Sequence, residues 1–322
     1  MTDRSGGAVP RVYAVVLNHR HSRDALRAVA SLFESTPRPA IVVVDNGSPS
    51  RQLEVLRSGL PADVSFVESR ENLGYAGGNN LGISVALQAG ADFVWMLNAD
   101  VVVEPEALSL LLAAAASHPR AGIIGSRVLH GHSEEIWFNG GEIVWGRGGA
   151  TRHLAMGKRD SEVPALGPSV VDYVTGAAML VRSEVFADAG LLPEDYFLYF
   201  EETDFSVRAR LAGWWAMHEP RSRVRHFKRS SGALPQPYFV YYFIRNRIVF
   251  GTRYTGWTAA RIVEDQQRFI ESWRRRVAKR AYDWLPVYER LVQMAIDDGT
   301  TGRTGRREDI EEVPGPGHGE AR

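Results

Sequence analysis

FVWMLNAD, residues 93–100, joins a run of apolar side chains to the polar residues Asn98 and Asp100. An apolar run of this length that is closed by polar residues is typical of a buried parallel strand. In an open α/β sheet, ligands bind at the carboxyl ends of the strands. A carboxylate there can hold a divalent metal ion against a phosphate. Alone, the short N-x-D pattern is more often a turn or a helix cap. The other motifs of the chain therefore have to show whether it belongs to a ligand site.

Apolar runs and helical spacing alternate through the first half of the chain. Strands are expected at residues 12–17, 41–44, 64–67, 93–97 and 121–124. Helices are expected between and after them, at residues 24–33, 53–57, 80–89 and 106–117. This alternation predicts the α/β class, with a Rossmann-like, mostly parallel sheet flanked by helices.

The second half is less regular. Short strand-like runs occur at 136–138, 142–144 and 177–181, and residues 238–296 have helical character. After residue 299 the chain is rich in Gly, Pro and Arg, which favours disorder. We therefore expect four parts: a disordered start at 1–10, an α/β domain at 11–237, a helical C-terminal extension at 238–298 and a disordered tail at 299–322.

Composition excludes some classes of protein. The 322 residues include 38 Lys+Arg and 38 Asp+Glu, so no net charge favours nucleic acid as a partner. There is no cysteine, which excludes disulfides, thiol nucleophiles and thiolate metal sites. The first ten residues lack the apolar core of a signal peptide, and no apolar stretch is long enough for a membrane span. We expect a cytoplasmic protein.

Polar residues follow several of the predicted strands. Asn18 follows the first, Asp45 and Asn46 follow the second, and Asn98 and Asp100 follow the fourth. Several such residues along one sheet edge indicate a ligand crevice. The segment DNGS at 45–48 is also a strong tight-turn signal, and both interpretations can hold together.

Three further segments could carry chemistry. The glycines of ENLGYAGGNN, residues 71–80, allow close approach of a phosphate to a helix start, although a plain Gly-rich loop is about as good an interpretation. Glu201, Glu202 and Asp204 precede a predicted helix, where acids commonly interact with the helix dipole but could also supply a general base. His226, amid basic residues, is a candidate metal ligand beside an Asp-held cation.

Taken together, these segments resemble the family 2 glycosyltransferases of the GT-A fold, most closely the rhamnosyltransferase-like and galactofuranosyltransferase-like branch. The resemblance covers about residues 11 to 250 and rests on eight segments in family order. They are VVLNHRH (15–21), VVVDNGS (42–48), ENLGYAGGNNLGI (71–83), MLNAD (96–100), VTGAAMLVR (174–182), YFLYFEETDFSVR (196–208), VRHFKRSSG (224–232) and YYFIRNR (241–247).

The resemblance implies a role for individual residues. Asn18, Asp45 and Asn46 match the region that contacts the base and ribose. The loop beside the nucleotide and donor sugar is matched by Asn72, Gly77, Asn79 and Asn80. The segment from Tyr173 to Met179 matches a loop near the donor sugar and the acceptor.

The resemblance also implies a metal site and a base. Asp100 matches the last carboxylate of the D-x-D motif. Asn98 occupies the position where the first Asp of that motif is usual, and we count it among the cofactor-binding residues. Catalytic roles fall to Glu202, which matches the usual general base with a side chain one methylene longer, and to Asp204, which matches the last acid of the E-D-x-D motif. His226 matches the later metal-binding histidine.

We therefore expect an inverting glycosyltransferase that uses Mg²⁺ or Mn²⁺ and a dTDP-, UDP- or GDP-sugar. The resemblance favours rhamnose, with a lipid-linked glycan, a polysaccharide end or a small molecule as acceptor. Two other classes stay open. One is a non-catalytic sugar-nucleotide binding protein, and the other is a nucleotidyltransferase, which would need a basic Gly-rich loop that VVLNHRH lacks.

A basic stretch near the C-terminus permits two interpretations. Trp273 and Trp284 flank a group of cationic residues, namely Arg274, Arg275, Arg276, Lys279 and Arg280. Such a helix can lie peripherally on the anionic inner face of the cell membrane. It can equally be a solvated helix that packs its Trp residues on the body. In either case Val277, Tyr282, Leu285, Tyr288 and Leu291 could form the packed face.

Overall fold

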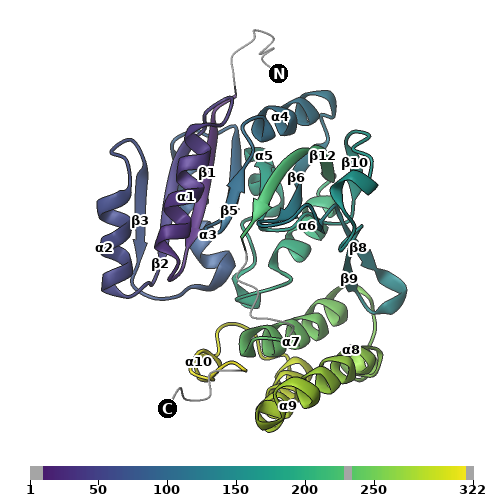
Figure 1. Ribbon diagram of the computed structural model, residues 1–322. Helices are drawn as coiled ribbons and strands as arrows, with labels where there is room; N and C mark the ends of the chain where they lie inside the picture. The colour runs from purple at the N-terminus through teal and green to yellow at the C-terminus, as the bar shows by residue number, and fades with distance from the viewer. Residues whose placement is uncertain (1–9, 228–233, 317–322) are drawn as a thin grey trace.

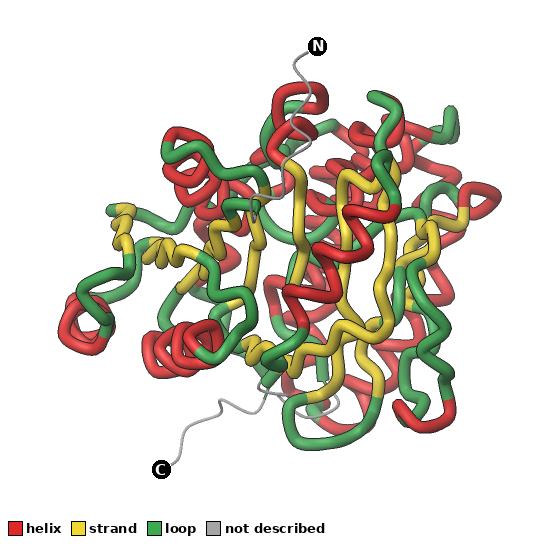
Figure 2. The backbone as a smooth tube through the Cα atoms, turned by 90° about the horizontal axis from the view of Figure 1, so that it is seen from above, coloured by secondary structure: helices red, strands yellow, loops and turns green. Residues whose placement is uncertain are grey.

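The computed structural model describes residues 10–227 and 234–316, and it has an α/β body above a layer of C-terminal helices (Figure 1). The view from above shows the strands of the body lying between helices (Figure 2). Two groups of buried apolar side chains fill the faces of the sheet, and a third lies within the C-terminal helices. This is the layered α/β architecture expected from the alternating pattern.

One large sheet carries most of the strands. They are β1 (Val12–Asn18), β2 (Ala40–Asn46), β3 (Ser65–Ser69), β4 (Phe93–Asn98), β5 (Val101–Val103), β6 (Ala121–His130), β7 (Ile136–Phe138), β10 (Ser169–Val171), β11 (Ala178–Arg182) and β12 (Trp215–His226). Their order is β10-β12-β6-β11-β4-β1-β2-β3, with β5 paired to β12 and β7 to β6. The pairs β1–β2, β1–β4, β2–β3 and β6–β12 are parallel, so these strands end at one edge.

Helices cover both faces of this sheet. They are α1 (Ser22–Phe33), α2 (Ser50–Gly59), α3 (Gly74–Gln88), α4 (Ala107–Ser117), α5 (Ser183–Ala189) and α6 (Glu201–Leu211). A separate hairpin is formed by β8 (Gly141–Val144) and β9 (Ala150–His153). The lower layer contains α7 (Pro237–Tyr254), α8 (Ala259–Arg280), α9 (Leu285–Thr301) and the short α10 (Glu308–Glu311).

The C-terminal tail differs from the prediction. Disorder was expected from residue 299, yet residues 299–301 complete α9 and the segment that follows contacts α7 and α9. Ile310 is 1% exposed, and Arg307 forms an ion pair with Asp298 at the end of α9. The burial of one apolar side chain and the ion pairing of the basic side chains stabilise this segment although it contains few apolar residues. The expected disordered start at 1–10 lies outside the described residues, except for residue 10. Residues 317–322 of the expected disordered tail also lie outside them. The boundary between an α/β domain and a helical extension at 237/238 stays a prediction.

Two other elements differ from the sequence interpretation. Helix α3 begins at Gly74 rather than at Asn80, so much of the expected Gly-rich loop is helical. Strand β12 was not expected, because its sequence WAMHEPRSRVRH is polar and lacks strict alternation. Pairing with β6, β5 and β10 nevertheless holds it inside the sheet, where it carries His226.

Candidate active site

A cavity of about 750 Å³ lies at the sheet edge where β4 ends, between the start of α6 and α7. Its polar lining includes Asn98, Asp100, Thr175, Glu201, Glu202 and His226. Its apolar lining includes Leu198, Tyr199, Phe200, Phe239 and Phe243. The structure thus brings together five of the candidate residues that sequence analysis named, from three distant segments of the chain, namely Asn98, Asp100, Glu201, Glu202 and His226.

Asp100 and His226 form the pair expected of a metal site. Val101 lies opposite His226 in the β5–β12 ladder, which places the imidazole beside Asp100. The His226 Nε2 atom is 3.0 Å from the Asp100 Oδ1 atom. Burial alone would raise the pKa of Asp100, but the hydrogen bond and charge of His226 hold that pKa below its ordinary value. The carboxylate is therefore in its metal-binding form at neutral pH.

The Asp100–His226 pair fits a divalent cation whose remaining ligands come from the enzyme's substrate. Among the described residues, no group of three or more His, Asp or Glu side chains could hold a metal ion by itself. One carboxylate and one imidazole suit Mg²⁺ or Mn²⁺ when diphosphate oxygens supply further ligands. Asn98, at the end of β4, contributes a neutral amide to the same lining.

Glu201 and Glu202 begin α6 at the cavity wall. The Oε2 atom of each is buried and has no hydrogen-bond partner among the described residues. Burial raises the pKa of Glu202 to about 7, although backbone hydrogen bonds act against this shift. Burial, and then the charge of Glu202, raise the pKa of Glu201 well above its ordinary value. A carboxyl group that titrates near neutral pH can act as a general base.

The segment before these acids is held in an uncommon backbone conformation. Phe197, Tyr199 and Phe200 have φ values of 64°, 69° and 76°. The Asn246 amide donates to the carbonyls of Tyr196, Leu198 and Tyr199 at 2.8–2.9 Å, so α7 holds the bend that presents Glu202. Such backbone strain persists where neighbouring groups enforce it. Sequence analysis quoted the YYFIRNR segment but assigned no role to Asn246 or Arg245.

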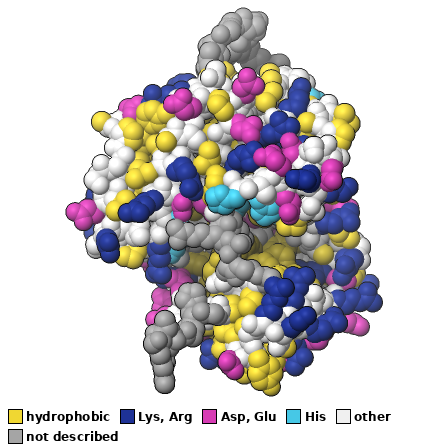
Figure 3. All heavy atoms as spheres, viewed as in Figure 1, with side chains coloured by type: hydrophobic (Ala, Val, Ile, Leu, Met, Phe, Trp, Pro, Cys, Tyr) yellow, Lys and Arg dark blue, Asp and Glu magenta, His cyan; other side chains and the backbone are white. Residues whose placement is uncertain are grey.

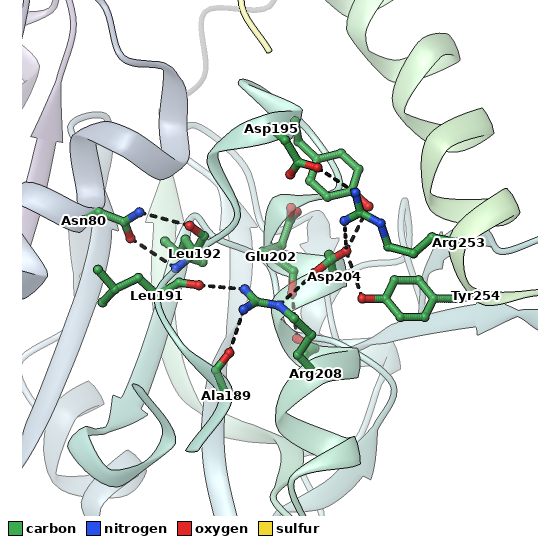
Figure 4. A network of polar contacts seen from close by, with 12 residues as sticks. Asn80, Ala189, Leu191, Leu192, Asp195, Glu202, Asp204, Arg208, Arg253 and Tyr254 are labelled. Atoms are coloured by element: carbon green, nitrogen blue, oxygen red, sulfur yellow. Dashed lines mark hydrogen bonds and ion pairs between the residues drawn. The ribbon is translucent and has the colours of Figure 1, made fainter. Parts of the chain in front are cut away.

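Asp204 lies outside the cavity, two residues from Glu202 (Figure 4). Its side chain is fully buried. It accepts hydrogen bonds of 2.8–3.0 Å from four neighbours, namely Tyr196, Arg208, Arg253 and Tyr254. These four partners hold the carboxylate away from the cavity lining, and the catalytic role predicted for Asp204 stays a prediction.

The polar residues at the ends of β1 and β2 bond to one another. The Asn18 Nδ2 atom donates to Asp45 Oδ1 at 2.7 Å and to Ser48 Oγ at 3.2 Å. Asn46 donates to the Gly74 carbonyl at 2.9 Å and to Asn72 Oδ1 at 3.1 Å. Asn18, Asp45, Asn46 and Asn72 are not among the residues that line the cavity. They hold the loops at this edge, and their predicted contacts with base and ribose stay predictions.

The residues of α3 also serve packing. Asn80 donates to the Leu192 carbonyl at 3.0 Å (Figure 4) and to Glu194 Oε1 at 2.8 Å, and it is not among the residues that line the cavity. Asn79 donates to the Tyr75 carbonyl of its own helix. A Cβ atom added to Gly77 would lie 2.8 Å from the Leu73 Cβ atom. The structure therefore places Gly77, Asn79 and Asn80 within the first turns of a helix rather than in an open loop.

Sequence comparison identifies the family. The model of glycosyl transferase family 2 matches residues 14–187, more than half of the chain. The chain belongs to glycosyl transferase family 2. It is therefore a glycosyltransferase. This family membership favours the glycosyltransferase interpretation over the two other classes, a non-catalytic sugar-nucleotide binding protein and a nucleotidyltransferase.

Relatives place this glycosyltransferase within the expected branch. N-acetylglucosaminyl-diphospho-decaprenol L-rhamnosyltransferase of Mycobacterium tuberculosis is 28% identical, over 73% of this chain and 82% of the relative. A galactofuranosyltransferase of the same species is 36% identical, over 35% of this chain and 38% of the relative. These similarities support the rhamnosyltransferase-like and galactofuranosyltransferase-like branch.

A solved structure supports the GT-A fold. The mannosyltransferase of Pyrobaculum calidifontis, in complex with GDP-Man and Mn²⁺, matches 91% of this chain and 87% of its own with a TM-score of 0.56. The identity is 13%, so this likeness concerns the fold alone. The predicted class, a mostly parallel sheet flanked by helices with a helical C-terminal extension, is confirmed.

Proposed function

We propose that this glycosyltransferase moves a sugar from a nucleotide-diphosphate sugar to an acceptor hydroxyl with inversion at the anomeric carbon. One observation carries the proposal: a single cavity joins the Asp100–His226 pair to Glu202, whose Oε2 atom has no hydrogen-bond partner among the described residues. The two ends of this arrangement suit the two ends of the reaction, since a diphosphate leaves while a hydroxyl loses its proton.

Glu202 is the proposed general base. Its raised pKa, about 7, leaves enough ionised carboxylate at neutral pH to accept a proton from the acceptor hydroxyl. As that proton moves to Glu202, the hydroxyl oxygen bonds to the anomeric carbon from the face opposite the diphosphate, and the bond to the diphosphate breaks. Asp204, in contrast, is proposed to position α6 through its four partners rather than to touch substrate.

Asp100 and His226 are the proposed holders of a divalent metal ion, Mg²⁺ or Mn²⁺. Such an ion, when bound, would stabilise the negative charge of the leaving diphosphate. Asp100 contributes a carboxylate already ionised by its contact with His226. Asn98 contributes at most a neutral oxygen, so we expect its part in binding to be smaller.

The donor and acceptor are proposed from the relatives. A rhamnosyltransferase and a galactofuranosyltransferase are among the similar proteins, and we propose rhamnose from dTDP-rhamnose as the donor sugar. The nucleotide is expected beside the ends of β1 and β2, near Asn18 and Asp45. The relative from Mycobacterium tuberculosis is named for an acceptor on diphospho-decaprenol, so a lipid-linked glycan is our proposed acceptor.

A peripheral membrane contact fits such an acceptor. No helix among the described residues is long and apolar enough to cross a membrane. Lys and Arg side chains gather over the C-terminal helices (Figure 3). Trp284, however, is 7% exposed and its Nε1 atom donates to the Pro314 carbonyl, so this Trp packs on the protein. Any membrane contact would rest on the exposed cationic residues of α8, such as Arg275 and Lys279.

A panel of nucleotide sugars tests the proposal. The protein is incubated with dTDP-rhamnose, UDP-galactose, UDP-galactofuranose and GDP-mannose, each with Mn²⁺ or with excess EDTA, and release of nucleoside diphosphate is measured. We expect metal-dependent release with one donor and stimulation by a lipid-linked glycan acceptor. Release at the same rate in EDTA would contradict the metal site, and no release from any donor would contradict the proposed donor class.

A further inference from the structure

The C-terminal segment of residues 303–316, which we name the strap, contacts α7, α9 and the loop after β3. After α9 ends, Gly305 N donates to the Asp195 carbonyl, and Arg307 N donates to Tyr242 Oη at 2.9 Å. Near its end, the Pro314 carbonyl accepts from Trp284 Nε1 at 2.9 Å. Figure 1 shows α10 beside α7, below the edge at which β1 and β2 end. The strap therefore contacts the segment before α6 and lies below the ends of β1 and β2.

Arg306 connects the strap to the loop after β3. Its Nη1 atom lies 3.5 Å from Glu71 Oε2. The same guanidinium donates to both carboxylate oxygens of Glu311, at 2.8 and 3.2 Å. The Arg306 side chain is 29% exposed and that of Glu311 is 23% exposed, so this pair is half-buried, whereas the Glu71 side chain is 68% exposed. Arg306 thus bridges one carboxylate of the strap and one of the body.

The loop that Arg306 reaches is the one that bounds the ends of β1 and β2. A Cβ atom added to Gly47 would lie 2.5 Å from the Glu71 carbonyl carbon and 2.6 Å from Asn72 N, so loop and strand end are in direct contact. Asn46 donates to Asn72 Oδ1. The His19 Nδ1 atom donates to the Asn46 carbonyl, 2.8 Å away. Burial lowers the pKa of His19, while its hydrogen bond to the Asn46 carbonyl and the charge of Glu311 oppose that shift.

A second contact ties the strap to the segment before the proposed base. Arg245, which is fully buried, donates through Nη1 to the Gly305 carbonyl at 2.7 Å and through Nη2 to the Tyr196 carbonyl at 2.8 Å. Tyr196 begins the bend that leads to Glu202. One side chain thus joins the strap to the acid side of the site, while Arg306 joins it to the nucleotide side.

We propose that the strap forms the outer wall of the donor-nucleotide site, and that Arg306 is a positioning residue that holds the Glu71–Asn72 loop in the form that binds the nucleoside diphosphate. This inference rests on the proposed function and adds to it a segment that lies outside the residues matched by the family model. A preorganised loop binds more tightly, because its ordering cost is met before the ligand arrives.

The experiment compares variants of the full chain. Arg306→Gln removes the bridge, and Glu71→Gln removes its partner on the body. Arg303→Gln is the matched control, because Arg303 lies in the same strap but pairs with Asp298, at 3.9 Å, rather than with the Glu71–Asn72 loop. Its side chain is 57% exposed. Binding of dTDP, UDP and GDP with Mn²⁺ is measured by calorimetry, together with the KM for the donor, kcat and Tm.

We expect Arg306→Gln and Glu71→Gln each to raise the nucleotide Kd and donor KM about fivefold, with kcat changed less than twofold. The double variant should show no further loss, because both substitutions remove one interaction. Arg303→Gln should leave Kd and KM unchanged. Equal Kd values in wild type and Arg306→Gln, with only a lower Tm, would overturn the inference and leave the proposed function standing. Failure of the wild type to bind any of the three nucleotides would overturn both.

Discussion

The polar side chains at two neighbouring parts of the sheet edge are in opposite states. At the ends of β1 and β2, Asn18, Asp45 and Asn46 are buried and bond to one another or to nearby backbone. Where β4 ends and α6 begins, the Oε2 atoms of Glu201 and Glu202 are buried without partners among the described residues. An unpartnered buried polar atom costs about 1–3 kcal/mol, whereas a paired one costs little.

This difference separates two kinds of polar residue that look alike in sequence. Paired residues hold loops and helix ends in place, and their loss should mainly affect folding. Unpartnered residues are retained at a cost in stability, which is expected where a ligand supplies the missing partner. Glu202 and Asp204, two residues apart on one helix, are examples of the two kinds. The predictions below test whether the distinction holds.

The largest effect is expected at the metal pair. Asp100→Ala should abolish metal-dependent donor binding, because the only carboxylate of the Asp100–His226 pair is lost. Asn98→Ala should cost less, since a neutral amide coordinates a divalent cation weakly. His226→Ala should raise the Mn²⁺ concentration needed for activity. Titration of Mn²⁺ into each variant with donor measures these effects, and full wild-type activity in excess EDTA would disprove all three roles.

Asp204→Ala should mainly reduce stability. Removal of this carboxylate leaves Arg208 and Arg253 without their buried partner, and we expect a loss of about 3 kcal/mol in the free energy of unfolding. Urea denaturation followed by circular dichroism measures the loss. Asp204→Asn, which keeps the shape, serves as the milder comparison. A stable Asp204→Asn variant with no turnover would show instead that Asp204 is the base.

Glu202→Gln should reduce activity without reducing stability, the opposite of the effect expected for Asp204→Ala. Turnover should fall at least about 10²-fold, since only proton removal is lost, while donor Kd stays nearly constant. The pKa of Glu202 is raised from 4.5 to about 7, so the folded state binds more protons than the unfolded state across that range. Stability therefore falls as pH rises from 4.5 to 7, and Glu202→Gln should raise Tm at pH 8. Wild-type turnover in this variant would refute its role.

The pH profile sharpens the same test. Because the base must be ionised, kcat/KM of the wild type should fall about tenfold per pH unit below pH 7 and level off above it. The profile of Asp204→Asn should keep this inflection, since that variant retains Glu202. Initial rates between pH 5 and 9 at a low donor concentration measure both curves. An inflection near pH 4.5 in the wild type would show that Glu202 does not control the rate.

The smallest effect is expected at the membrane surface. Arg275 is 73% exposed at its side chain, and each such cationic group adds about 1 kcal/mol at an anionic surface. Co-sedimentation with anionic vesicles should exceed that with neutral vesicles at low salt and decline at high salt. The double charge reversal Arg275→Glu with Lys279→Glu should remove the difference. Equal binding to neutral and anionic vesicles would point to a helix that serves packing alone.

The packed face of this C-terminal region was predicted in large part. Val277, Tyr288 and Leu291 are at most 1% exposed, as the spacing indicated, but Tyr282 is 73% exposed. Tyr282 begins a short 3-10 helix between α8 and α9 and does not continue the α-helical face of α8. A helical period does not continue across such a break, which is why the pattern failed at that residue.

Local patterns in the sequence were enough for much of the fold. The apolar runs before Asn18, Asp45 and Asn98 place these residues at strand ends, because a buried parallel strand needs apolar side chains on both faces. The acids Glu201, Glu202 and Asp204 were placed just before a helix, and the structure begins that helix at Glu201, so they lie in its first turn. These predictions succeeded since each depends on residues close together in the chain.

Tertiary contacts decided which of these residues meet. Asp100 and His226 are 126 positions apart and become neighbours only through the pairing of β5 with an unexpected strand, β12. Helical geometry places Glu202 and Asp204 on nearly opposite faces, but only the packing of α6 shows that Glu202 faces the cavity. The strap is ordered by Asp298, Tyr242 and Glu71, none of which its own composition could indicate. Long-range pairing of this kind leaves no local pattern, because its free energy depends on the partner as much as on the residue itself.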